Sequence, residues 1–117
     1  MTTAQIILTG GRALLALLFV LAGITKIIGP RPVLDHMRQE HVPVVLLPLV
    51  IALEIGAGGA LLVGWHTEIA AAVLAAFCLA TALVFHRNFA ERAERTQFFK
   101  DIALAGGLAM LAASLAS

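Results

Sequence analysis

Charged residues are scarce in this sequence. Of its 117 residues, 13% are charged and 61% are hydrophobic, whereas an average soluble domain carries about 25% charged residues. A soluble domain of this length keeps much of its surface in water and cannot bury that much apolar area. A soluble helical bundle is excluded for the same reason, because its outer helix faces would need charges that are missing. The composition therefore predicts a membrane protein.

Cysteine and aromatic residues are also rare. The single cysteine, Cys78, excludes an intrachain disulfide and any chemistry that needs a cysteine pair. There is no tyrosine, one tryptophan and a formal net charge of +1. The sequence thus lacks the basic stripe and the stacking aromatics of a nucleic-acid-binding protein, so we expect no nucleic acid partner. It also lacks a ligand set for haem, flavin or an iron–sulfur cluster.

Long apolar runs are what the sequence does contain. Crossing a bilayer core of about 30 Å takes about 20 helical residues, and no segment shows the alternation of a strand. The first run lacks the basic start of a cleaved signal and is expected to be a retained helix. We predict an all-α integral membrane four-helix bundle, a single transmembrane domain over residues 1–117. Its expected helices are at about 6–28, 44–63, 68–85 and 98–117.

Lysine and arginine predict the orientation of these helices. Seven of the eight lie in or beside the first and third connections, and only Arg12 lies on the other side. Because positive residues favour the cytoplasmic side, both termini are predicted on the outer, periplasmic side. Trp65 in the second connection is suited to an outer interfacial anchor. The sequence "ERAERT", before the fourth helix, is typical of a solvated loop or a short interfacial helix.

Small residues recur at helical spacing in the two middle helices. Such ridges let helix backbones approach closely in lipid. We expect both ridges to be packing surfaces: Ala52, Gly56, Ala60 and Gly64 in the second helix, and Ala71, Ala75, Cys78 and Ala82 in the third.

Glu54 is the most unusual residue, a carboxylate near the middle of a predicted span. An ionisable group at that depth is costly and normally faces a partner inside the bundle. Side chains tilt toward the N-terminus of their own helix, so Glu54 leans toward the cytoplasm while Lys26 and His86 lean inward from the cytoplasmic ends of their helices. We predict that these three groups converge. Alternatively, Glu54 is a protonated group that only holds helices together.

The first helix presents one stripe toward the bundle. Its residues are Arg12, Phe19, Gly23 and Lys26, spaced by seven, four and three. Gly23 leaves room for a close neighbour or a ligand. Arg12 leans outward and is expected to reach the outer headgroups, and both Arg12 and Lys26 also fit ordinary anchors at helix ends. Lys100, at the start of the fourth helix, leans back toward water.

The first connection contains two histidines near an acidic residue. His36, Glu40 and His41 are grouped in "HMRQEH". The spacing departs by one residue from the zinc-binding pattern His-x-x-Glu-His. We therefore expect no metal site there.

Four segments, in order, resemble the helices of the DoxX family of small bacterial inner-membrane proteins. They are "GRALLALLFVLAGITKIIG", "ALEIGAGGALLVG", "TEIAAAVLAAFCLATALVFH" and "QFFKDIALAGGLAML". The resemblance covers essentially the whole chain and implies a multi-pass inner-membrane protein linked to oxidoreductases. The positions it carries over are Arg12, Phe19, Gly23, Lys26, Glu54, His86 and Lys100. Asp101 stands where many members have asparagine, which departs from the family pattern.

The resemblance implies a redox-associated subunit, because the family name traces to a small subunit associated with thiosulfate:quinone oxidoreductase activity. We expect Glu54, Lys26 and His86 to be catalytic, since quinone reduction requires protons that a carboxyl and an imidazole can carry. Phe19, Gly23, Lys100 and Arg12 are expected to contact the cofactor, a quinone. The expected partners are the bilayer, a redox or sulfur-metabolism protein and a second copy of the chain. A non-enzymatic scaffold, or a path for protons or a small solute, remains an alternative.

Overall fold

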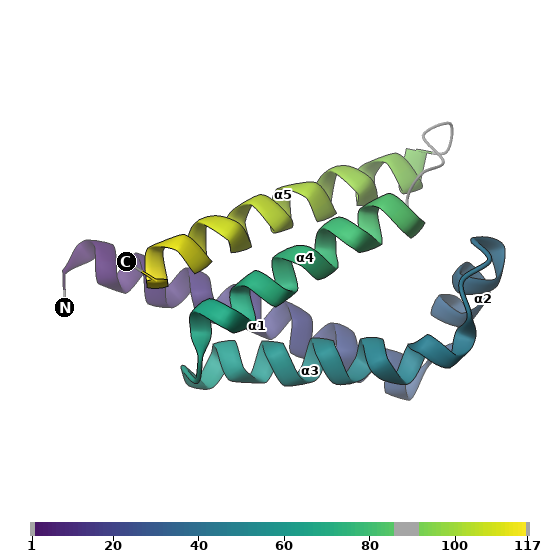
Figure 1. The fold of residues 1–117 in the computed structure, drawn as a ribbon, viewed down its shortest axis with the longest axis horizontal. Helices are drawn as coiled ribbons and strands as arrows, with labels where there is room; N and C mark the ends of the chain where they lie inside the picture. The colour runs from purple at the N-terminus through teal and green to yellow at the C-terminus, as the bar shows by residue number, and fades with distance from the viewer. Residues whose placement is uncertain (1, 86–91, 117) are drawn as a thin grey trace.

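The computed structural model describes residues 2–85 and 92–116, and every regular element in them is helical (Figure 1). The elements are α1 (Thr3–Ile28), α2 (Arg31–Gln39), the 3-10 turn η1 (Val44–Leu46), α3 (Leu47–Val63), α4 (Thr67–Phe85) and α5 (Arg92–Ala116). Four helices are long and apolar enough to cross a membrane. The prediction of an all-α membrane bundle is therefore confirmed, while the side on which the termini lie stays a prediction.

The long helices overlap the four expected segments, with the largest difference in a boundary at the start of α5. This helix begins at Arg92, about six residues before the expected start at residue 98. The "ERAERT" segment contributes its Arg92–Thr96 part to the first turns of α5 instead of forming a separate loop. Alanine, glutamate and arginine all have high helix propensity, which explains the extension.

Local signals fix the ends of the other helices. Thr2 caps α1: its hydroxyl accepts from the backbone N–H of Gln5, and the Gln5 side chain accepts from the backbone N–H of Thr2, a capping box. Pro48 lies in the first turn of α3, where it removes no helical hydrogen bond. Gly64 ends α3 with a φ of 86°, a left-handed conformation that favours glycine.

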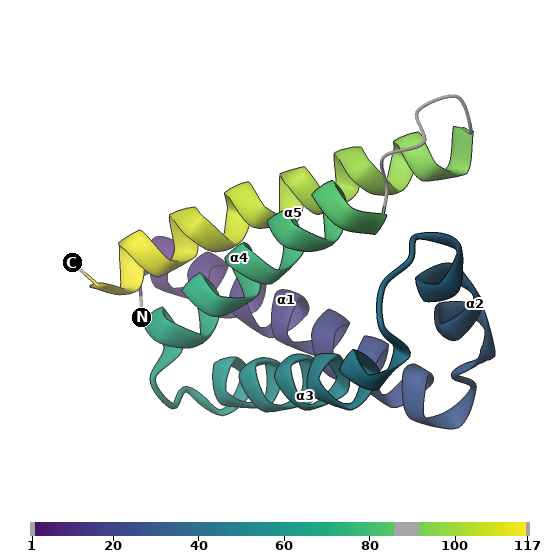
Figure 2. The ribbon, with the colours of Figure 1, turned by 45° about the vertical axis from the view of Figure 1, so that its right-hand side comes forward.

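The four long helices form two pairs that diverge. α1 packs against α3, α4 packs against α5, and α3 contacts α4 between the pairs. Both termini lie at one end, and α2 lies at the other, between the diverging pairs (Figures 1 and 2). The buried hydrophobic core, which includes Ala16, Leu61, Leu74 and Leu108, occupies the middle of the bundle and the end near the termini. The end near α2 is therefore less completely filled.

Helix α2 lies in a segment for which the sequence predicted only a connection. It has nine residues, with Pro32 in its first turn. One of its sides faces the bundle, where Met37 is only 1% exposed, while Arg31 and Arg38 face outward. This separation of apolar and charged residues is typical of a helix at a membrane interface.

Close packing of α3 against α1 depends on glycines other than those predicted. The expected ridge on α3 is wrong at Ala52 and Gly56, which are exposed, and a Cβ at Gly56 would meet no atom within 4 Å. Its member Ala60 does pack against the core. A Cβ at Gly58 would lie 3.1 Å from Val20 Cγ2, and one at Gly23 would lie 2.5 Å from Ile55 Cγ1. Gly23 and Gly58 therefore allow the two backbones to approach.

The expected ridge on α4 is confirmed. Ala71 and Ala82 are fully buried, Cys78 is 2% exposed and Ala75 is half-buried. Small side chains on this face let α4 pack closely against its neighbours.

Candidate functional site

Glu54 lies on the buried face of α3. It shares that face with Gly58 and Leu61, four and seven residues further along the helix, and only 2% of the residue is exposed. The close approach of α1 at Gly23 brings the last turn of α1 next to this carboxylate. The tertiary packing thus supplies the partner that a charge at this depth requires.

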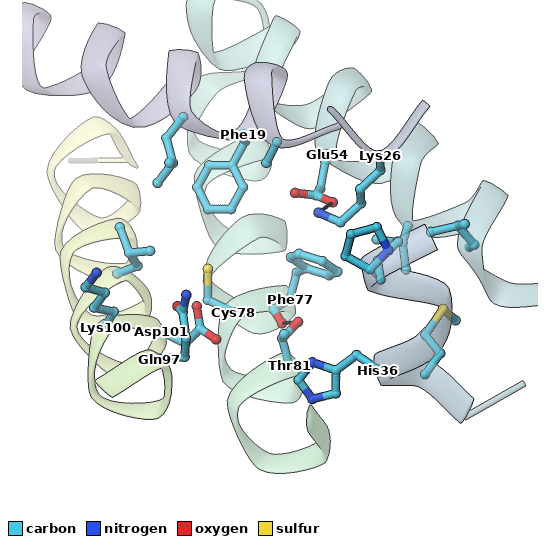
Figure 3. Close-up of a pocket in the computed structure, with 18 residues that line it drawn as sticks. Phe19, Lys26, His36, Glu54, Phe77, Cys78, Thr81, Gln97, Lys100 and Asp101 are labelled. Atoms are coloured by element: carbon cyan, nitrogen blue, oxygen red, sulfur yellow. Dashed lines mark hydrogen bonds and ion pairs between the residues drawn. The ribbon is translucent and has the colours of Figure 1, made fainter. Parts of the chain in front are cut away.

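That partner is Lys26. Its Nζ atom donates to Glu54 Oε1 over 2.6 Å, with side-chain exposures of 23% for Lys26 and 3% for Glu54 (Figure 3). The directions agree with the sequence prediction, in which Lys26 leans back into the bundle and Glu54 leans to meet it. A lysine ammonium has three N–H donors, and this contact uses one of them. In the ion pair, the Glu54 carboxylate is therefore almost fully buried, while the Lys26 ammonium is partly exposed and has N–H donors left for another partner.

A cavity of about 600 Å³ adjoins this ion pair at the α2 end of the molecule. All five α-helices contribute to its wall, and the aromatic rings of Phe19 and Phe77 face it together with aliphatic side chains. It occupies the space that the diverging helix pairs leave open beyond the packed core. Its position follows from the splay of the bundle.

Further polar side chains line the cavity across from the ion pair. His36 reaches it from α2, Thr81 from α4, and Gln97 and Asp101 from α5 (Figure 3). The Thr81 hydroxyl donates to the carbonyl oxygen of Phe77 in its own helix over 2.8 Å, which fixes its orientation. The cavity thus combines an apolar middle with hydrogen-bonding groups on separate walls.

The formal charges of the cavity wall balance. Its charged residues are two cations, Lys26 and Lys100, and two anions, Glu54 and Asp101. The wall therefore carries no net formal charge. The arrangement suits an uncharged molecule with polar groups, since an added charge at this depth would lack a counterion.

The cavity brings together four of the seven residues that the sequence selected: Phe19, Lys26, Glu54 and Lys100. Gly23 does not line it and instead packs against Ile55 of α3. His86 lies outside the described residues.

Arg12 is also separate from the cavity, at the opposite end of the bundle. A Cβ at Gly64 would lie 3.7 Å from Arg12 Nη1, so the guanidinium lies beside the C-terminus of α3. A cation is favourable there because of the helix dipole. Arg12 is half-buried, and its Nε atom makes no hydrogen bond within the described part of the chain. Arg12 is therefore positioned to stabilise the end of α3.

Sequence reasoning missed His36, Thr81 and Gln97 as cavity residues and noted Asp101 only as a departure from a family pattern. A signal for His36 was present: Pro32, Val33, His36 and Met37 follow helical spacing and form one face of α2. The described residues contain no group of three His, Cys, Asp or Glu side chains placed to hold a metal ion. His36 lines the cavity from α2.

Comparison with known proteins identifies one family and a curated relative. The DoxX family model matches residues 7–87, which span α1 to α4. The inner membrane protein YqjF of Escherichia coli (strain K12) is 43% identical over 101 residues, covering 86% of this chain and 78% of that protein. No solved structure matches the chain.

Proposed function

The chain belongs to the DoxX family, and from that premise we propose that it is a redox-associated subunit whose cavity binds a quinone head group. Its four apolar spanning helices and its inner-membrane relative make it a multi-pass protein of the bacterial inner membrane. The observation that carries the proposal is the cavity beside the Lys26–Glu54 ion pair. A redox or sulfur-metabolism protein would supply the electrons.

The chemistry of the cavity fits a quinone ring. A volume of about 600 Å³ lies within the range of about 300–1,000 Å³ typical of small-molecule sites. Phe19 and Phe77 offer aromatic surfaces against which a flat ring can pack. The partly exposed ammonium of Lys26 has N–H donors for a carbonyl oxygen. The balanced wall charges are compatible with the neutral ring.

A quinone in this cavity would act as the acceptor of electrons and protons. Lys26 would orient the ring by donating to one carbonyl oxygen. Glu54 holds the Lys26 side chain in place, and its carboxylate would take up a proton and pass it to that oxygen as the ring is reduced. His36, on the α2 wall, would provide a second proton-exchanging group. His86 remains a predicted third member of the site.

Replacing Glu54 by glutamine tests the proton role. Glutamine keeps the size and a hydrogen-bonding oxygen for Lys26 but does not titrate. We expect Glu54→Gln to insert and fold, and to bind a benzoquinone in nanodiscs with affinity close to that of the wild-type chain. Thiol- or thiosulfate-driven quinone reduction by membranes that contain the variant should fall by about 10²-fold or more.

Glu68→Gln is the matched control, because Glu68 is an exposed carboxylate in the first turn of α4 at the far end of the molecule. It should leave both binding and reduction unchanged. Full quinone reduction by Glu54→Gln would refute a proton role for Glu54. Failure of the wild-type chain to bind any quinone would refute the proposed function.

A scaffold role is the second candidate, and one observation favours it. The Lys26–Glu54 contact joins α1 to α3 at a buried position, which is what a purely structural ion pair would do. Purifying the full chain from native membrane, with mass spectrometry of its bound proteins and lipophilic molecules, separates the two roles. A stable protein partner without a bound quinone or redox enzyme would support the scaffold.

A further inference from the structure

A second hollow, an apolar groove of about 420 Å³, lies between α1 and α5. Leu15 and Leu18 of α1 form one side, and Lys100, Ala103, Leu104 and Gly107 of α5 form the other. Only Lys100 carries a charge. Within the described chain, α1 and α5 are not one of the closely packed helix pairs, which explains why a groove is left at this seam.

The groove lies next to the cavity. Leu18, Lys100 and Leu104 line both hollows. On α5 the groove residues follow helical spacing, which places them on one stripe running from Lys100 toward the middle of the helix. Figure 3 shows Lys100 on the α5 side of the cavity. The groove therefore extends from beside the cavity along α1 and α5.

We infer that this groove holds the apolar tail of the ligand whose head group occupies the cavity. The inference rests on the proposed function and specifies its ligand class as an uncharged ring with a long hydrocarbon tail, which enters between α1 and α5 from the bilayer. An anionic phospholipid fits less well, because its net negative charge would enter a wall whose two cations are already balanced by Glu54 and Asp101.

The effect of the groove on binding is expected to be steric. A hydrocarbon tail gains little free energy on moving from lipid to an apolar groove, because both surroundings are equally apolar. What the groove provides is a path for the tail while the ring is seated. Blocking the path should therefore hinder a tailed ligand and leave a tailless one unaffected.

Adjacent glycines on α5 provide a matched test. Gly106 and Gly107 are both exposed, and a Cβ at either position would meet no atom within 4 Å, but only Gly107 lines the groove. The full-length variants Gly107→Leu and Gly106→Leu in nanodiscs would be titrated with two fully substituted benzoquinones, tetramethylbenzoquinone and its analogue with one methyl replaced by a decyl chain. Full substitution prevents addition of the Cys78 thiol to the ring.

We expect Gly107→Leu to weaken binding of the decyl compound by at least tenfold and to leave binding of the tetramethyl compound unchanged. Gly106→Leu should change neither. Ala103→Leu, one turn away in the same groove, is a second blocking variant should Gly107→Leu not fold, and the same selective loss is expected.

The other outcomes overturn the inference. Equal binding of the decyl compound by the Gly107→Leu and Gly106→Leu variants would show that the tail does not use this groove. If Gly107→Leu weakened binding of both compounds equally, the substitution would be acting on the ring in the cavity and not on the tail in the groove. In either case the proposed function would stand, because the wild-type chain would still bind the ring. If the wild-type chain bound neither compound, both proposals would fail.

Discussion

At the scale of single residues, Glu54 and Lys26 each provide the opposite charge that the other needs at this depth in the membrane. A carboxylate or an ammonium near the centre of a membrane span costs about 2.5–3.5 kcal/mol on insertion scales. The contact of 2.6 Å between Nζ and Oε1 offsets that cost by pairing the charges where water is scarce. Removing one partner therefore does more harm than removing both.

Single and double replacements of Lys26 and Glu54 should reveal the energetic coupling between the two charges. Lys26→Met leaves Glu54 buried without its cation, and we expect it to lower the free energy of unfolding by about 3–5 kcal/mol. The double variant Lys26→Met/Glu54→Leu should recover most of that loss. Denaturation of the full chain in mixed micelles, followed by circular dichroism, measures both.

The exposed pair of Asp35 and Arg38 on α2 is the control. Its side chains are 62% and 64% exposed at an N–O distance of 3.5 Å. Arg38→Met should change stability by less than about 1 kcal/mol, because water and salt screen such a pair. A double variant at Lys26 and Glu54 as unstable as Lys26→Met alone would contradict the coupling.

At the scale of elements, the register between α1 and α3 decides which residues meet. Gly23 lies against Ile55, and Gly58 lies against Phe19 and Val20, so the two helices approach at two points along their length. This register brings the last turn of α1 beside the middle of α3. The Lys26–Glu54 contact is a consequence of that packing.

Alanine at Gly23 should disturb this register. Its Cβ would come within 2.5 Å of Ile55 Cγ1, a distance that requires a neighbour to move. Overpacking of this kind costs about 1–3 kcal/mol. We therefore expect Gly23→Ala to be less stable than Gly56→Ala by about that amount, measured by the same denaturation. Gly56 is a suitable control because its Cβ would point into open space, and equal stability of the two variants would refute the close approach.

At the scale of the whole molecule, the packed core and the cavity divide the bundle between its two ends. The core lies toward the termini, and the cavity lies toward α2. The helix pairs diverge at the α2 end (Figure 2). Lys26, Arg31, Arg38 and Lys100 belong to this α2 end. The positive-inside rule therefore predicts that the cavity is near the cytoplasmic surface and that both termini face the periplasm.

Cysteine labelling can test this orientation. In a Cys78→Ala background, Thr3→Cys and Gln39→Cys each provide one exposed thiol, at opposite ends of the bundle. A membrane-impermeant maleimide applied to intact spheroplasts should label Thr3→Cys and should reach Gln39→Cys only after permeabilisation. The reverse labelling pattern would show the opposite orientation, with the cavity toward the periplasm.

The sequence alone predicted much of this protein because the bilayer restricts what an apolar chain can do. Runs of sufficient length predicted the four spanning helices, and the depth of Glu54 together with side-chain direction predicted its contact with Lys26. Chain segments such as "GP" after the first run marked helix ends. These features depend on residues close together in sequence or on position across the membrane.

Only the tertiary structure decided which face of each helix packs against its neighbours and which face is exposed. Apolar residues surround α3 and α4 almost uniformly, since lipid and protein interior favour the same side chains, so periodicity could not distinguish Gly58 from Gly56 as the packing residue. The same uniformity hid the divergence of the helix pairs, and with it the cavity, the groove and the contribution of His36 from α2. The sequence determined that a bundle with buried charge would form, and the packing of the helices determined where it is hollow.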